Sequence, residues 1–359
     1  MRRPAPDDMG DMTRGAADEP LVAVVMPVYN GADSLERSIE CVTAQTHRNW
    51  VLAISDNLSD DDSLEIARRH ARADERITVY EGDSFVPMLA NWNRAMSHVP
   101  PEARYVKQLN ADDMMLPACI EQMVALAERH PSVSVVGAYR KEGKLIAAVD
   151  LAVDQQVVPG AEFVRRALLG GLDYVGAPGS VLFRAVPSMP AGEFYDPGVW
   201  PPDKPVAFPR WSVDKEPIYD LLETGDFGFV HQLLTYEPDD QGGQTSFTLR
   251  IRAQIPGDLQ LLLSRGPRFL AREEFRRAVD TAVWSYSWLL AKQTLKLRPW
   301  RDRDFRAYHH AATEALAAEL RDAGFRSAAR RLDLWTGLYA AGGPLSGARF
   351  AEPRALRRA

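Results

Sequence analysis

The chain has 359 residues, 46% of them hydrophobic, which is enough for two compact units with buried cores. No apolar run reaches the roughly 20 residues that a membrane-spanning helix needs, and the polar segment 1–20 lacks the apolar core of a signal peptide. Two cysteines without CxxC spacing argue against a disulfide framework or a zinc site. We therefore expect a cytoplasmic protein with a disordered leader.

Charge is distributed unevenly along the chain, whose net charge is −6. Residues 1–249 carry 22 basic and 38 acidic side chains, whereas residues 250–359 carry 21 and 11. The acidic part would repel a phosphate-bearing ligand unless a cation intervened. The basic part would meet an anionic partner or face the acidic part.

Apolar runs that are typical of buried strands alternate with amphipathic stretches in the first third of the chain. The runs lie at 21–26, 50–55, 77–80 and 105–109, and helices are expected from 34, 64, 88 and 117. This alternation predicts an α/β fold with a doubly wound, mostly parallel sheet. The polar loops after the first, second and fourth strands should gather at one edge of that sheet.

An acidic pair, Asp112 and Asp113, follows the fourth strand. Adjacent carboxylates repel each other unless a cation or hydrogen-bond donors compensate them, and Mg²⁺ and Mn²⁺ prefer carboxylate oxygens and bridge phosphates. The first turn reads PVYNG, so neither glycine-rich phosphate loop is present. The pair therefore favours a divalent metal site, with a solvated acidic turn before a helix as the alternative.

Several segments resemble the family 2 glycosyltransferases of the GT-A fold. They are Val24–Asn30 (VVMPVYN), Ile54–Asp61 (ISDNLSDD), Asn110–Asp113 (NADD) and Gly176–Arg184 (GAPGSVLFR). The resemblance is closest to members with an SDNxSxD second loop and an NxNRA helix, here Asn91–Ala95. It covers about residues 21–250 and implies a GT-A sheet with a C-terminal helical appendage.

The resemblance also implies roles for single residues. The nucleotide would be bound by Pro27, Val28, Tyr29, Asn30, Asp56, Asn57 and Asp112, with Asp112 on the ribose. Asp56 would accept a hydrogen bond from the ring N–H of a pyrimidine, although such a loop favours an Asx-turn in any case. Asp113 would coordinate Mn²⁺ or Mg²⁺. Arg94 and Lys107 would neutralise phosphate or form structural ion pairs. Asn110 stands where many relatives carry a third acid, which would weaken a metal site that needed it.

The segment Trp211–Gly225 should contain the catalytic base. Relatives carry an acidic pair followed by a helix that ends at a glycine, and Asp214 takes the position of the second acid, with Val213 in place of the first. The resemblance implies that Asp214 deprotonates the acceptor hydroxyl, with Glu216 as the fallback base and an N-cap role as the alternative. Asp239 stands where relatives often carry a histidine that serves the metal or the diphosphate, so either Asp239 takes over as an oxygen ligand of the metal or this loop has diverged.

The C-terminal third shows helical periodicity around 275–290, 305–320 and 325–338, and Pro299 should break it. The aromatic and basic stretch from Trp284 to Trp300 fits either a bundle core or an anionic membrane surface, and the regular apolar stripes favour the core. No aromatic-glycine RNA motif is present, so we expect no nucleic acid partner.

These patterns give one hypothesis for the whole chain. We expect a leader at 1–20, a GT-A domain at 21–250 with nucleotide and acceptor halves at 21–115 and 116–250, helices at 251–345 and a basic tail at 346–359. The protein would be a metal-assisted, inverting glycosyltransferase that moves a sugar from a UDP- or dTDP-type donor to a glycan or glycolipid hydroxyl in cell-envelope polysaccharide biosynthesis. It would act in the cytoplasm, with peripheral contact at the inner face of the membrane.

The departures at Asn110, Val213 and Asp239 leave a non-catalytic nucleotide- or glycan-binding scaffold as the alternative. A sugar-1-phosphate nucleotidyltransferase would show a Gly-rich, basic first loop, which PVYNG is not.

Overall fold

The computed structural model describes residues 19–149, 151–171, 178–187, 189–196, 199–200, 208–209, 212–238 and 244–341. The chain divides into two compact units that interleave along the sequence. The first comprises Met1–Gln156, Gly176–Phe194 and Gly228–Glu237, and the second comprises Val157–Val175, Tyr195–Phe227 and Pro238–Ala359. Parts of the expected domain 21–250 are therefore grouped with the C-terminal helices.

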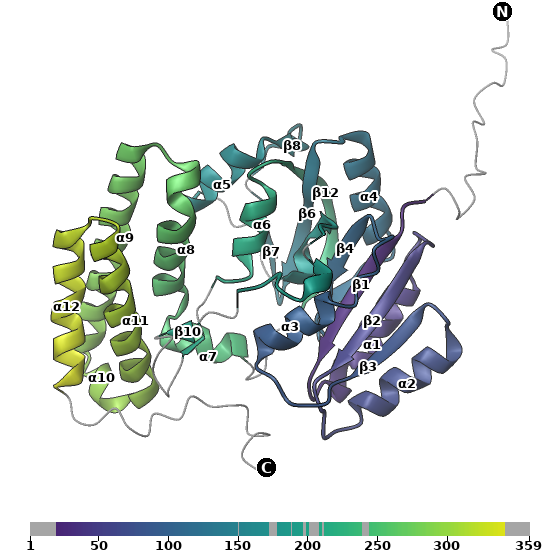
Figure 1. Cartoon of the computed structure of the whole chain (residues 1–359), viewed down its shortest axis with the longest axis horizontal. Helices are drawn as coiled ribbons and strands as arrows, with labels where there is room; N and C mark the ends of the chain where they lie inside the picture. The colour runs from purple at the N-terminus through teal and green to yellow at the C-terminus, as the bar shows by residue number, and fades with distance from the viewer. Residues whose placement is uncertain are drawn as a thin grey trace, which may run out of the picture. The chain divides into compact units, whose positions relative to one another are not determined.

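The sheet of the first unit begins with four parallel strands in the order β3-β2-β1-β4 (Figure 1). They are β1 (Val22–Val28), β2 (Trp50–Asp56), β3 (Ile77–Glu81) and β4 (Tyr105–Gln108), close to the predicted runs. β1 is buried along its whole length, as its continuous apolar run predicts for a strand with neighbours on both sides. The register pairs Val28 with Asp56, so the loops that follow β1 and β2 start side by side.

Beyond β4 the strand pairing becomes antiparallel. β9 (Leu182–Arg184) pairs with both β4 and β6 (Val133–Glu142), and β7 (Leu145–Ala147) forms a hairpin with β6. β12 (Asp226–Glu237) pairs with β5 (Met114–Met115). That register pairs Tyr236 with Met114, which brings the end of β12 beside the segment that follows the acidic pair.

Four amphipathic helices accompany these strands: α1 (Ala32–Thr43), α2 (Ser63–Ala73), α3 (Met88–Met96) and α4 (Cys119–Arg129). α1 buries Leu35, Ile39 and Val42, whose spacing of four and three residues keeps them on one face. α3 packs on β1 and β2, and α2 packs on β2 and β3. The predicted alternation of strand and helix is confirmed.

Helices dominate the second unit. They are α5 (Gly160–Leu168), α6 (Lys215–Leu221), α7 (Gln244–Ile251), α8 (Gln254–Phe269), α9 (Arg272–Leu295), α10 (Arg298–Arg301), α11 (Arg303–Asp322) and α12 (Arg326–Ala340). The remaining short elements are β8 (Val157–Val158), β10 (Val199–Trp200), β11 (Phe208–Pro209), η1 (Pro178–Ser180) and η2 (Met189–Ala191), of which η1 and η2 belong to the first unit. α8, α9, α11 and α12 pack side by side as a bundle (Figure 1).

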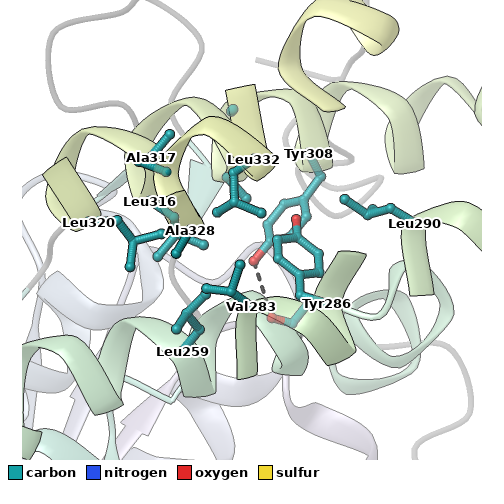
Figure 2. Close-up of a cluster of buried hydrophobic side chains, with 14 of the residues drawn as sticks. Leu259, Val283, Tyr286, Leu290, Tyr308, Leu316, Ala317, Leu320, Ala328 and Leu332 are labelled. Carbon is teal, nitrogen blue, oxygen red and sulfur yellow. Dashed lines mark hydrogen bonds between the residues drawn. The ribbon is translucent and has the colours of Figure 1, made fainter. Parts of the chain in front are cut away.

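The bundle core contains the apolar stripes that the sequence predicts. Val283, Tyr286 and Leu290 of α9 meet Tyr308 and other side chains of α11 and α12 (Figure 2). His309 Nδ1 lies 2.7 Å from the Tyr286 hydroxyl, and its Nε2 lies 2.7 Å from the carbonyl oxygen of Ile251. Burial lowers the pKa of His309 to about 3, so the ring is neutral at physiological pH.

The preference for placing the tryptophans of α9 and α10 in the core was wrong. Trp284, Trp288 and Trp300 are exposed, because the side of α9 that packs in the bundle is the one carrying Val283 and Tyr286. α9 ends at Leu295, four residues before the predicted break at Pro299. Within the part of the chain that the structure describes, no helix combines the length and apolar character needed to cross a bilayer.

Candidate active site

The loops after β1 and β2 hold each other in place. Asn30 adopts a left-handed conformation (φ 50°), which asparagine tolerates better than most residues. Its backbone N–H donates to Ser59 Oγ at 3.0 Å, and its Oδ1 accepts from the backbone N–H of Asp60 at 2.9 Å. Asp61 Oδ2 accepts from the N–H of Ala32 at 2.9 Å. The edge of the sheet predicted to bind nucleotide is thus built before any ligand arrives.

Asp56, at the end of β2, is 3% exposed. Its Oδ2 accepts from the Ser59 backbone N–H at 3.1 Å, which is the local turn bond expected of such a loop. Its Oδ1 is buried and has no hydrogen-bond partner among the described residues. A buried acceptor without a partner is costly, so this oxygen favours a ligand that brings an N–H donor.

Asn57, the residue after Asp56, fixes the segment that precedes α3. Asn57 donates from Nδ2 to the Val86 carbonyl at 2.8 Å and accepts from the Val86 N–H at 3.0 Å, so its amide holds the segment before α3. That segment places Phe85 against Tyr29, with ring centroids 5.0 Å apart. Pro27 and Val28 are buried within β1. Their nucleotide contacts remain predictions.

The acidic pair splits into an exposed and a buried member. Asp112 is exposed, as a ribose contact requires, whereas Asp113 is buried. Asn110 Nδ2 donates to Asp113 Oδ2 at 3.0 Å, so the residue that departs from the family pattern positions the proposed metal ligand. Ser38 Oγ on α1 donates to the Ala111 carbonyl at 2.9 Å, which ties this loop to α1.

Glu237 is a third carboxyl group at this site that the sequence did not reveal. It ends β12, accepts from Ser180 Oγ at 3.1 Å and lies 3.9 Å from Arg140 Nε. Burial raises the pKa of Asp113 well above its usual range, and the charges of Asp112 and Glu237 raise it further. Long-range pairing of β12 with β5 and β6 brings Glu237 here, and no local motif encodes that pairing. Asp239, the predicted second ligand, lies outside the described residues.

Lys107 has a structural role. It is fully buried in β4, and its Nζ donates to the carbonyls of Gly179 at 2.6 Å and Val181 at 3.2 Å. Burial lowers its pKa. These bonds hold η1 against the acidic pair so closely that a Cβ at Gly179 would stand 2.9 Å from Asp113 Oδ2.

Arg94 on α3 is the stronger candidate for a phosphate contact. Its Nη2 donates to the Ser84 carbonyl at 3.1 Å, while Nη1 is buried without a hydrogen-bond partner among the residues described. A guanidinium with an unused donor suits an anion.

The predicted base lies in the second unit. Asp214 precedes α6, is half-buried and makes no capping bond to that helix, so the N-cap alternative lacks its defining contact. Burial raises the pKa of Tyr195, and the charge of Asp214 raises it further. Glu216 is buried 3.5 Å from Arg265 Nη2, which also pairs with Asp220 at 2.9 Å. That ion pair makes Glu216 the weaker proton acceptor. Val213, in place of the family's first acid, is buried.

The same unit contains a cleft of about 690 Å³ between the end of α5, α8 and α9. Leu259 and Leu262 form apolar wall, and Asp258, Thr281 and Ser285 offer polar groups. Ser212 Oγ, two residues before Asp214, donates to Asp258 Oδ1 at 2.7 Å and so joins the base loop to the cleft wall.

Residues 23–167 match the model of the family described as Glycosyl transferase family 2. This segment, which is less than half of the chain, is similar to a family 2 glycosyltransferase domain. EpsE of Bacillus subtilis (strain 168), named as a glycosyltransferase, is 30% identical over 170 residues, which are 46% of this chain and 57% of EpsE. TuaG of the same organism, named as a teichuronic acid biosynthesis glycosyltransferase, is 32% identical over 121 residues, 33% of this chain and 47% of TuaG. The chain thus spans about half the length of these curated relatives.

Solved structures show the fold of this chain. The S. aureus TarS 1–349 structure in complex with UDP-GlcNAc superposes with a TM-score of 0.57 and 12% identity, covering 90% of this chain and 92% of that chain. At this identity the likeness shows the fold alone, and it confirms the predicted GT-A architecture.

GT-A glycosyltransferases generally use a divalent metal ion. The described residues contain no group of three or more His, Cys, Asp or Glu side chains arranged to hold one. Mg²⁺ is usually bound through one or two carboxylates together with substrate phosphates, so a protein cage of three is not required. The buried Asp113 beside two further acids has the oxygen chemistry and the excess charge that a divalent cation would relieve. The residues present therefore fit the group.

Proposed function

We propose that the protein is a metal-assisted, inverting glycosyltransferase that transfers a sugar from a UDP- or dTDP-linked donor to a hydroxyl group of a glycan or glycolipid. The observation that carries the proposal is Asp113, a buried carboxylate whose pKa is raised by burial and by two neighbouring acids. Such a group at a sheet edge with interlocked polar loops would suit a divalent cation, which would supply positive charge to a diphosphate.

The first unit would bind the donor. Asp56 Oδ1 would accept the ring N–H of uracil or thymine, because that oxygen is buried and otherwise unsatisfied. Asp112 would contact the ribose, and Arg94 would donate to a phosphate. Asp113 would hold Mg²⁺ or Mn²⁺, oriented by Asn110, and the bound cation would neutralise charge that develops on the departing diphosphate.

The second unit would supply the base. Asp214 would accept the proton of the acceptor hydroxyl while that oxygen forms a bond to the anomeric carbon and the bond from that carbon to the diphosphate breaks. One displacement from the opposite face inverts the configuration. The cleft beside Asp258 has hydroxyl-binding groups next to an apolar wall, which supports a carbohydrate acceptor.

Similar proteins support this donor and acceptor class. The TarS complex holds UDP-GlcNAc, and the name of TuaG places that relative in teichuronic acid biosynthesis. We infer a cell-envelope glycan or glycolipid acceptor for this chain, and a place at the cytoplasmic face of the membrane where such acceptors are built.

Calorimetric titration of UDP with and without Mn²⁺ tests the proposal. Wild-type protein should bind UDP more tightly with Mn²⁺, and Asp113→Asn should lose that difference while remaining folded. Asp33→Asn, an exposed acid at the start of α1, is the charge-matched control. Metal-dependent binding that survives in Asp113→Asn would remove the metal assignment. Tight UDP binding without hydrolysis or transfer across a donor and acceptor panel would replace the enzyme by a binding scaffold.

A further inference from the structure

The outward side of α9 displays large apolar side chains. Trp284 is 57% exposed, Trp288 is 55% exposed and Leu295 is 84% exposed. Their spacing of four and seven residues places them on one helical face, opposite the buried Val283 and Tyr286. The two indole rings stack with centroids 6.1 Å apart. From Trp284 to Leu295 the face is about 16 Å long.

The apolar face continues past the end of α9. Leu297 is 54% exposed and adopts a left-handed conformation (φ 55°), which is strained for a residue with a branched side chain. Pro299 is buried, whereas Trp300 is 44% exposed. We call Trp284, Trp288, Leu295, Leu297 and Trp300 together the tryptophan surface.

Exposed cations accompany the C-terminal end of the tryptophan surface. Lys292, Lys296, Arg301 and Arg303 are exposed, and none of them forms a salt bridge with a described residue. The nearby Asp302 is already paired, with Arg250 at 2.9 Å and Arg298 at 3.4 Å. The C-terminal part of the surface is therefore apolar with basic neighbours, whereas the exposed Asp280 precedes Trp284 by one helical turn.

We propose that the tryptophan surface docks on an anionic lipid bilayer. Indole rings favour the headgroup level because they join an apolar body to a polar N–H, and lysine and arginine beside them are attracted to anionic headgroups. Contiguous exposed apolar groups on a folded protein indicate an interaction site. A second copy of this chain is a poorer occupant, because self-association would bring the same lysines and arginines face to face.

Docking would hold the enzyme where a lipid-linked acceptor lies. This consequence rests on the proposed function, but binding itself needs no donor, metal or acceptor. Vesicle binding and sugar transfer are therefore measured separately, and transfer to a water-soluble acceptor should not depend on the tryptophan surface.

Flotation of the full-length protein with vesicles provides the test. Binding should occur to phosphatidylcholine vesicles that contain one quarter phosphatidylglycerol, should weaken as salt rises, and should be far weaker to pure phosphatidylcholine. Brominated lipids should quench tryptophan fluorescence. Lys292→Gln with Lys296→Gln should lower the partition coefficient about 30-fold, at roughly fivefold for each lysine. Trp284→Ala with Trp288→Ala should lower it at least as much.

Leu145→Ala with Ile146→Ala is the matched control, because these two side chains on β7 are also exposed and apolar. The control should bind vesicles like wild type. Equal binding by the tryptophan variant, or no binding by wild type to anionic vesicles, would overturn the proposal. A dimer that dissociates in the tryptophan variant during analytical ultracentrifugation would assign the surface to a second copy instead. Vesicle binding without any transfer would leave docking intact and count against the proposed function alone.

Discussion

Asp56 accepts a local turn bond with one oxygen, and its other oxygen has no hydrogen-bond partner among the described residues. The turn bond from Ser59 to Oδ2 explains why an aspartate fits the loop, but it does not explain why Oδ1 is buried without a partner. In the sequence, the turn and the nucleotide contact are competing roles for Asp56. The structure shows that the two oxygens make them compatible.

Asp56→Asn should therefore weaken UDP binding without unfolding the loop. An asparagine can keep an oxygen toward the Ser59 N–H, but it presents an amide N–H where the pyrimidine also brings a donor. The lost bond should lower UDP affinity roughly ten- to a hundredfold, the effect of about 1–3 kcal/mol. Calorimetric titration measures it. Asp60→Asn, a change at an exposed residue of the same loop, should leave UDP affinity unchanged. Equal UDP affinities for wild type, Asp56→Asn and Asp60→Asn would show that Asp56 does not contact the nucleobase.

Lys107 shows why some residue roles were not predictable from sequence. A lysine in a strand beside two aspartates fits a phosphate contact as well as a structural one. The distinction depends on the Gly179 and Val181 carbonyls, more than seventy residues away, which cap its ammonium group. Glu237 escaped prediction for the same reason, because its position depends on a long-range antiparallel pairing.

Among the helices, periodicity predicted the elements well and their exposed faces less well. α9 carries two apolar stripes, one through Val283 and Tyr286 and one through Trp284 and Trp288. Both have helical spacing, so the pattern indicates a helix in either case. Which stripe is buried depends on where α8, α11 and α12 pack, and that information is not local.

The same glycine-to-alanine change should have opposite effects in two helices of the second unit. At Gly160, where α5 begins, a Cβ would stand 1.9 Å from the Gly225 carbonyl oxygen and 2.2 Å from that of Leu222. Gly160→Ala should therefore lower the unfolding free energy by about 1–3 kcal/mol. At Gly337 in α12 a Cβ would meet open space, so Gly337→Ala should raise it by about 0.5–1 kcal/mol. Urea denaturation followed by circular dichroism measures both, and a shift of the same sign would contradict the packing.

The buried His309 should make the helical bundle sensitive to acid. Its pKa is about 3 in the folded state and about 6.5 in the unfolded chain. Between these values only the unfolded state binds the proton, so the unfolding free energy should fall by about 1.4 kcal/mol for each pH unit below 6.5.

The difference between wild type and His309→Gln isolates this effect, because other groups titrate alike in both proteins. Urea denaturation between pH 6.5 and 4.5, followed at 222 nm, should show a shallower pH slope for the variant. His130→Gln, at the end of α4 in the other unit, should keep the wild-type slope. Parallel slopes for wild type and His309→Gln would show that His309 is not the acid-sensitive group.

For the whole molecule, the sequence indicated a sheet domain followed by helices, but not how the chain is shared between the two units. The segment at 157–175 belongs with the helices because α5 packs on α8 and Arg165 pairs with Glu274 of α9. The segment at 195–227 belongs there because Arg265 of α8 pairs with Asp220 of α6. Single ion pairs of this kind are not readable from periodicity, so a boundary near residue 250 was the simplest prediction.

This division separates the two halves of the proposed reaction. The donor-binding residues lie in the first unit and Asp214 lies in the second. Asp214→Asn should therefore lower kcat by about 10²–10⁴ without changing UDP affinity, since a general base contributes roughly that factor.

Glu216→Gln should keep most of kcat but lower stability, because it weakens a buried ion pair with Arg265. Initial rates at saturating donor, UDP titration and thermal denaturation of the same preparations distinguish the two variants. If Glu216→Gln lost transfer and Asp214→Asn retained it, the base would be Glu216, and its pairing with Arg265 would have to break before the acceptor could react.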